Sequence, residues 1–287
     1  MKALKAKKQI LQSQVSNARS RNNERQLERE LQRFFDRLGK QVQSNLEEYW
    51  SDHLLQGQIN LISKPIREAQ AEYYLILQKY NKREYRLGIQ EAERLAKLSN
   101  KPVAEKAIKP RLFKRFDLFA TLRGAEEDLL ERVFLASQAT LNRVDTSIKT
   151  LLTDGYQSGK GINYVANLLT KRFDQLQTWE AQRIARTEIH NSHNTAVMDT
   201  YNEYGVEYTM WISADDERTR ESHLEINGEI IRLGDTYSNG LRFPGDTDGP
   251  IEEWINCRCS NAPYVLPYGY TAPPQQQFRE NDLIKIK

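Results

Sequence analysis

Three short stretches near the end of the chain decide its fold: Trp211-Ile-Ser-Ala-Asp-Asp-Glu-Arg-Thr-Arg-Glu-Ser-His223, Phe243-Pro-Gly-Asp246 and Ile255-Asn-Cys-Arg-Cys259. Their polar residues stand at turn-like positions between short apolar runs, which is typical of a small β-rich unit whose loops surround a cleft. A predicted helix carrying Ala185-Arg-Thr-Glu188 precedes them. The sequence therefore predicts an α+β protein, with long-helix N-terminal and middle regions followed by a small C-terminal β-rich domain.

Strand signals are confined to this last part of the chain. Residues 206–212 alternate and are rich in β-branched and aromatic side chains, which predicts a strand. Asn227-Gly228 separates residues 224–226 from 229–231 and predicts a hairpin. Residues 255–265 are expected to form the last strand. Residues 267–287, with paired prolines and three consecutive glutamines, predict an extended tail that reaches a neighbouring subunit.

The ordered set of motifs resembles the phage head-morphogenesis family, the minor head proteins similar to phage Mu protein F. The resemblance covers about residues 160 to 265. It rests on Arg186, Thr187 and Glu188, then Trp211, Asp215, Arg218, Thr219, Arg220 and His223, then Pro244, Gly245 and Asp246, then Asn256, Cys257, Arg258 and Cys259. Many members carry a His-Pro segment just before the Cys-x-Cys, where this chain has Glu252-Glu-Trp-Ile255.

The resemblance implies a structural minor capsid protein of a tailed phage rather than an enzyme. It implies association with the portal or the capsid interior and with packaged DNA, in head assembly and in genome ejection. The implied partners are the portal protein, the major capsid or scaffolding protein, and double-stranded DNA. The implied location is the virion, at the capsid interior or portal vertex, with the host cytoplasm as the site of assembly.

An enzyme is the competing hypothesis, namely a metal-dependent nuclease or nucleotide-modifying transferase. Glu188 and His223 are the acid and base candidates for such a reaction, and no activated nucleophile stands beside them in the sequence.

The chain has two cysteines, Cys257 and Cys259, and with one residue between them a mutual disulfide would be strained. Together with His223 they are the candidate metal ligands, and zinc is the ion that such a set favours. The alternative is that they are two small core residues on one side of a strand, with Arg258 on the other side. Both interpretations stay open, with no cofactor as the expectation and zinc as the alternative.

A helix is predicted over residues 178–204, with Thr178 as its N-cap. Its residues Arg183, Arg186, His190 and His193 are three and four apart, so they share one face, and we expect this face to line the cleft. Because a guanidinium group matches a carboxylate in shape, Arg186 is predicted to clamp Asp215 or Asp216 on the loop after the first strand.

The net charge of +3 hides a division of the chain. Residues 1–123 hold 26 Lys and Arg against 14 Asp and Glu, a net +12, and residues 124–287 hold 16 against 25, a net −9. A basic region is typical of contact with phosphates or an acidic partner, and the alternative is a set of solvated helix faces.

We predict a basic helical region for portal or DNA contact over 1–123, a helical middle over 124–177, the Mu F-like domain over 178–266 and the tail over 267–287.

The basic region also contains the clearest helix pattern. Its apolar stripe lies opposite Arg25, Arg29, Arg33 and Lys40, and consists of Leu27, Leu31, Phe34, Leu38, Val42, Leu46 and Tyr49. Pro65 is predicted in the first turn of a second helix that ends near residue 98, and Asp154-Gly155 is predicted to end a helix from about 125. No run of about 18 apolar residues occurs, so we expect no membrane-spanning segment, and the basic start does not resemble a signal peptide.

Overall fold

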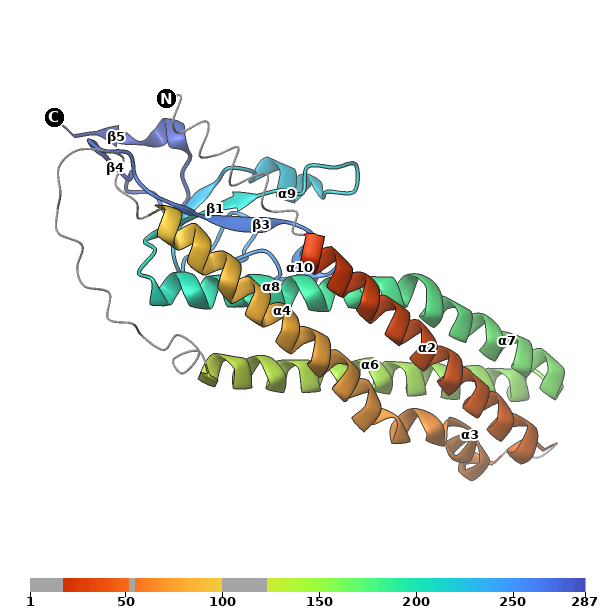
Figure 1. Cartoon of the computed structure of the whole chain (residues 1–287). Coiled ribbons are helices and arrows are strands. Elements are labelled where there is room, and N and C mark those ends of the chain that lie inside the picture. The colour runs from red at the N-terminus through yellow and green to blue at the C-terminus, as the bar shows by residue number, and fades with distance from the viewer. Residues whose placement is uncertain (1–17, 52–54, 100–122, 287) are drawn as a thin grey trace. The chain divides into compact units, whose positions relative to one another are not determined.

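The computed structural model describes residues 18–51, 55–99 and 123–286 (Figure 1). These residues group into two compact units. One, here named the C-terminal unit, takes its described residues from 18–21, 82–99, 123–128 and 186–286. The other, named the helical unit, takes them from 22–51, 55–81 and 129–185. The sequence also predicts a linker between Pro102 and Pro110 and a compact apolar and basic cluster at 112–119. These segments and the first seventeen residues lie outside the described residues.

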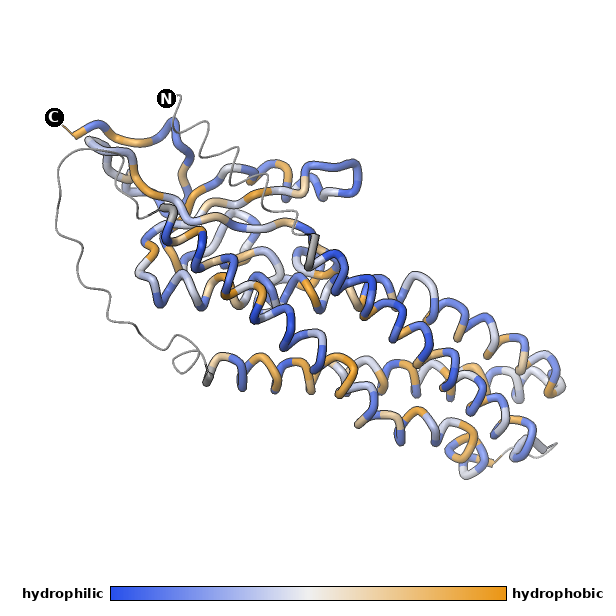
Figure 2. Tube along the Cα trace, viewed as in Figure 1, coloured by the Kyte–Doolittle hydropathy of each residue, from blue (hydrophilic) through white to orange (hydrophobic). Residues whose placement is uncertain are grey.

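The helical unit is built from α3 (Gln56–Glu68), α7 (Ile162–Gln175) and parts of α2 (Ala18–Tyr49), α4 (Gln70–Ser99) and α6 (Arg123–Gln157). Six of the seven residues of the predicted apolar stripe on α2 are buried, which confirms that helix, whereas Tyr49 at its end is half-buried. The buried six are Leu27, Leu31, Phe34, Leu38, Val42 and Leu46. Along the helices, hydrophobic residues recur between hydrophilic ones (Figure 2). Phe34 packs against Tyr73 of α4 with ring centroids 5.1 Å apart. Burial of this stripe, rather than local propensity, holds the helices together.

Pro65 lies inside α3, so its predicted place in the first turn of a new helix is wrong. A proline has no N–H, and the carbonyl of Leu61, four residues earlier, therefore loses its helical partner. The side chain of Asn45 on α2 replaces it, with Nδ2 donating to Leu61 O at 2.9 Å. The helix then breaks at Ala69, and α4 begins at the next residue.

Two further helix boundaries differ from the prediction. α6 continues to Gln157, past Asp154 and Gly155, and its last turns bury Leu152 and place Tyr156 edge-on to Trp50. Thr178 is not an N-cap, because α7 runs through a π-helical turn, η1 (Leu176–Glu180), into α8 (Ala181–Glu203). Its hydroxyl instead donates to Asp174 O at 2.8 Å. Favourable packing at each place outweighs the local stop or start signal.

A three-stranded antiparallel sheet with the order β2-β1-β3 lies in the C-terminal unit. β1 (Tyr208–Ile212) confirms the predicted strand and pairs with β2 (Ile230–Arg232) and β3 (Ser260–Tyr264), so that Thr209 stands opposite Ile231 and Pro263. The predicted hairpin is wrong in its first arm, since residues 221–225 form the short helix α9 (Glu221–Glu225). Gly228 instead leads directly into β2, with its N–H donating to Trp211 O at 2.9 Å. The α+β class is confirmed.

Residues 267–286 are folded onto the sheet and do not form the predicted extended tail. β4 (Tyr270–Thr271) pairs with β5 (Ile284–Lys285), and η2 (Glu280–Asp282) lies between them in sequence. Phe278 exchanges two backbone hydrogen bonds with Ile230 of β2, at 2.7 and 3.0 Å, and its ring packs against Tyr208. Burial of this aromatic side chain, which is 3% exposed, stabilises the folded arrangement over an extended one.

Within the ranges that the structure describes, no helix is both long enough and apolar enough to cross a membrane.

Replacing glycine by alanine should change the stability in opposite directions at two positions, because one glycine is closely packed and the other is not. A Cβ at Gly88 of α4 would lie 2.6 Å from the backbone oxygen of His193 on α8, whereas one at Gly57 of α3 would meet nothing within 4 Å. Gly88→Ala should therefore destabilise the protein by about 1 to 3 kcal/mol through overpacking. Gly57→Ala should stabilise it by about 0.5 to 1 kcal/mol through helix propensity. Urea midpoints measured by circular dichroism check this, and a rise of the midpoint for Gly88→Ala would contradict the close contact.

Candidate functional site

The site is assembled where α8 meets the loops that carry the sequence motifs. Asn194 is 2% exposed, and its amide nitrogen donates to Pro244 O at 2.8 Å and to Cys259 O at 3.2 Å. One side chain on the helix therefore ties together two loops that lie fifteen residues apart in sequence. Since both carbonyls would otherwise need another donor inside the protein, this amide fixes their positions.

About two turns earlier on α8, the Arg-Thr pair holds the Asn-Cys-Arg-Cys segment. The Arg186 guanidinium donates to Asn256 Oδ1 at 3.0 Å, and the backbone N–H of Asn256 donates to Thr187 Oγ1 at 3.0 Å. Asn256 has a φ of 57°, in the left-handed region that asparagine tolerates better than most residues. These contacts explain why an asparagine stands immediately before the cysteines.

Gly245 and Asp246 shape the next loop. Gly245 has a φ of 89°, and a Cβ there would lie 2.7 Å from Asn191 Oδ1, so only glycine fits against α8. The Asp246 carboxylate accepts from the Arg242 backbone at 3.1 Å and from two guanidinium nitrogens at 2.8 Å. Burial raises the pKa of Asp246, but the bonds from Arg242 outweigh burial and hold it below its ordinary value.

The loop after β1 closes on itself and not on Arg186. The Asp216 carboxylate accepts from the Arg218 backbone N–H at 3.0 Å and from Thr219 Oγ1 at 3.2 Å, and it forms an ion pair with Arg258. The bond from Arg258 is the main cause that lowers the pKa of Asp216 to about 2. The prediction that Arg186 clamps Asp216 is therefore wrong. Asp215 is exposed, with a φ of 54°, and serves as a bend in this loop.

The predicted polar face of α8 has mixed partners. Arg186 contacts the β-rich part, whereas His193 Nδ1 lies 3.0 Å from Glu84 Oε1 on α4 and its Nε2 lies 3.8 Å from Glu91 Oε2. Burial lowers the pKa of His193, and its bond to Glu84 outweighs that effect and raises it. Burial lowers the pKa of His190 to about 4. The face therefore does not line one cleft, because α4 is a neighbour of α8 as well.

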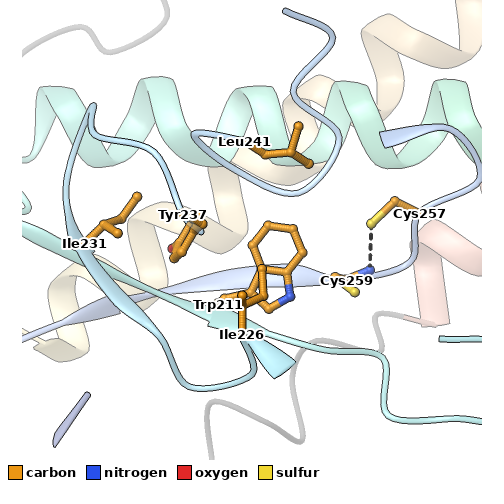
Figure 3. Close-up of a cluster of buried hydrophobic side chains, with 7 residues drawn as sticks. All are labelled: Trp211, Ile226, Ile231, Tyr237, Leu241, Cys257 and Cys259. Carbon is orange, nitrogen blue, oxygen red and sulfur yellow. Dashed lines mark hydrogen bonds between the residues drawn. The ribbon is translucent and has the colours of Figure 1, made fainter. Parts of the chain in front are cut away.

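His223, Cys257 and Cys259 lie together in the interior. Their ligand atoms are all within 4.8 Å of one another, and among the described residues they form the group that could hold a metal ion. His223 Nδ1 is 3.3 Å from Cys259 Sγ and 3.7 Å from Cys257 Sγ. Trp211 packs edge-on to the imidazole with ring centroids 5.0 Å apart. Figure 3 shows the two cysteines beside Trp211 and Leu241, with Cys259 N donating to Cys257 Sγ at 3.4 Å.

Glu253 completes this cluster, and the sequence patterns did not identify it. Its Oε2 lies 2.9 Å from His223 Nε2, and its two oxygens accept from Ser222 Oγ at 3.0 and 3.3 Å. It comes from α10 (Ile251–Trp254), which occupies the place of the His-Pro segment in the resembling family. That departure was the available signal. The hydrogen bond from the Cys257 thiol lowers the pKa of Cys259, and the same bond raises the pKa of Cys257.

The remaining motif residues play other parts. Arg218 is exposed, and Glu188 is half-buried on α8. The acid in contact with His223 is Glu253 rather than Glu188. The arrangement therefore places two cysteine sulfurs and one carboxylate around a buried imidazole. It does not bring together Glu188 and His223, the acid and base candidates from the sequence.

Comparison with known proteins shows which family this part of the chain is similar to. Residues 146–262 match the family described as Phage Mu protein F like protein, and this match supports a phage minor head protein family. The matched segment begins inside α6 and ends in β3. It contains every motif residue described above.

Two relatives each match part of this chain. The chain is 28% identical to minor head protein GP7 of Bacillus phage SPP1 over 120 residues, which are 40% of this chain and 39% of that protein. It is 35% identical over 85 residues to an uncharacterised protein of Haemophilus influenzae, which are 30% of this chain and 17% of that protein. The chain thus covers well under half of the length of either relative. No solved structure matches it significantly.

The side chains of Asn194 and Arg186 on α8 differ in burial, so we expect their removal to change the free energy of unfolding by different amounts. Asn194→Ala should destabilise the C-terminal unit by about 1 to 3 kcal/mol, because it leaves two buried carbonyls without their donor. Asn194→Asp should be at least as destabilising, since it keeps the size but exchanges the donor for an acceptor. Arg186→Ala removes a bond at the surface and should cost less, about 0.5 to 1.5 kcal/mol. Urea midpoints followed by tryptophan fluorescence check the order, and an unchanged midpoint for Asn194→Asp would refute it.

Proposed function

We propose that this chain is a structural minor head protein of a tailed phage, incorporated during head assembly in association with the portal or the capsid interior. The observation that carries the proposal is that the family motifs make internal contacts. Arg186, Thr187 and Asn194 bind the loops at 244–246 and 256–259, and Asp216 binds Arg258. Residues used in this way build a stable module and present no reactive group to solvent.

Burial of the one imidazole in the cluster supports the structural reading over the enzymatic one. A general base must reach the proton that it removes. His223 is 1% exposed, and both of its ring nitrogens already face protein groups. The name of the SPP1 relative, minor head protein, supports the same proposal. We extend the proposal to genome ejection, in which a protein bound to the packaged DNA would leave with it.

Heads assembled with and without portal test this role. The full chain is co-expressed with the portal and capsid proteins of its own phage, and its copies per purified head are quantified. We expect the chain in heads that contain portal and little or none of it in shells that lack portal. Equal incorporation into both would contradict portal association. Absence from every head, together with cleavage of plasmid DNA by the purified chain and divalent ions, would contradict the structural role.

The basic face of α2 is the surface that we propose for contact with packaged double-stranded DNA. Arg25, Arg29 and Arg33 are all exposed and stand four residues apart on one helix. A helix rises 1.5 Å per residue, so their Cα atoms span about 12 Å along its axis. Three guanidinium groups in a row suit a phosphate backbone, whose charges attract them without regard to base sequence.

Neutralising this row should weaken DNA binding and its salt dependence. The triple variant Arg25→Gln, Arg29→Gln, Arg33→Gln is compared with Arg143→Gln, Lys160→Gln, Lys171→Gln, which removes the same charge from exposed positions on α6, before α7 and on α7. For every phosphate that the variant no longer neutralises, the slope of log K against log salt should become shallower by about 0.9. Fluorescence anisotropy with a short duplex at several salt concentrations measures this slope. Equal slopes for the two variants would show that α2 is not the contact surface.

A further inference from the structure

We propose that His223, Cys257 and Cys259 bind a zinc ion through Nδ1 and two Sγ atoms. This inference does not depend on the function proposed above. It starts from geometry. In a tetrahedral site with Zn–S near 2.3 Å and Zn–N near 2.0 to 2.1 Å, nitrogen and sulfur ligands lie about 3.6 Å apart. The observed separations of His223 Nδ1 from the two sulfurs are 3.3 and 3.7 Å.

The orientation of the imidazole also fits a metal ligand. Its Nε2 lies 2.9 Å from Glu253 Oε2, so the proton of the neutral ring belongs on Nε2 and the lone pair of Nδ1 faces the sulfurs. A carboxylate on the far nitrogen of a histidine ligand is the usual outer contact of zinc sites, since it fixes the tautomer and the ring orientation. Ser222 holds Glu253 in turn, at 3.0 Å.

A purely apolar core explains this cluster less well. Cys257 and Cys259 do pack with Trp211, Ile231 and Leu241, and the two thiols are not joined in a disulfide. Two core thiols, however, need no imidazole nitrogen between them, and a thiol is only a weak hydrogen-bond donor to a buried nitrogen lone pair. A divalent ion would bind all three groups at once, as two thiolates and one neutral histidine, and its binding would release the protons of the two thiols.

The soft ligand set selects the ion, and the count of ligands sets its coordination. Thiolate and imidazole together favour zinc over magnesium or calcium, which prefer oxygen. Three protein ligands leave the fourth tetrahedral position to a water molecule or another small ligand. The ion would connect α9 directly to the segment before β3, and through Glu253 to α10. It would thereby join three pieces of the motif region that contribute little regular structure of their own.

The experiment uses the full chain without a histidine tag, expressed in zinc-supplemented medium. Metal content is measured by mass spectrometry, and the apo protein is titrated with Co²⁺ while thiolate-to-cobalt charge-transfer and d–d bands are recorded. We expect one zinc per chain and cobalt bands typical of a tetrahedral site with two thiolates. Wild-type protein that lacks zinc and develops no such bands would overturn the proposal, whatever the variants do.

Variants then assign the ligands. Cys257→Ser, Cys259→Ser and His223→Asn should each lose most of the bound zinc. Glu253→Gln should keep the stoichiometry at saturation but bind zinc about 10 to 100 times more weakly in competition with a chelator. Glu217→Gln, which removes the charge of an exposed residue on the loop after β1 that is not a ligand, should bind zinc like the wild type. Full zinc content in both cysteine variants would refute the assignment, even if one of them folds poorly.

Discussion

The amide of Asn194 is the constraint on which the motif region depends. It is the buried donor that holds Pro244 O and Cys259 O against α8, and the loops of Gly245 and of the two cysteines keep their places only if both carbonyls are satisfied. Hydrogen bonds of this kind contribute little net free energy but are costly to leave unmade. The small sheet has only three short strands, so it needs such contacts from the helix to fix its loops.

Much of the helical architecture follows from sequence, because its signal repeats. Of the seven apolar residues predicted to share one face of α2, the first six, over about five turns, are buried. β1 could also be predicted from the sequence, since five consecutive residues there are of types that favour strands, and all five are buried. The ordered motifs from Arg186 to Cys259 were sufficient to indicate the family, because their order along the chain is more specific than any one of them.

The errors have a common physical origin in contacts between residues distant in sequence. Asn227-Gly228 does form a turn. It connects the short helix α9 to β2, however, and not two strands of a hairpin, and an Asn-Gly pair is compatible with either arrangement. Pro65 indicates the start of a helix when the sequence is considered alone. The hydrogen bond from Asn45 to Leu61 O, which allows Pro65 inside a helix, is visible only in the structure. Glu253 was not identified for the same reason, since its role comes from a histidine thirty residues earlier in the chain. Local patterns report propensity, and these positions are decided by tertiary structure.

The folded C-terminal segment also bears on how copies of this protein behave when crowded. A sheet edge with open backbone groups can add strands from another molecule. Here Phe278 occupies the outer side of β2 through its bonds to Ile230, and the other edge strand, β3, contains Pro263, which cannot donate to a ladder. Both sides of this sheet are thereby made poor templates for adding a strand from another copy of the chain.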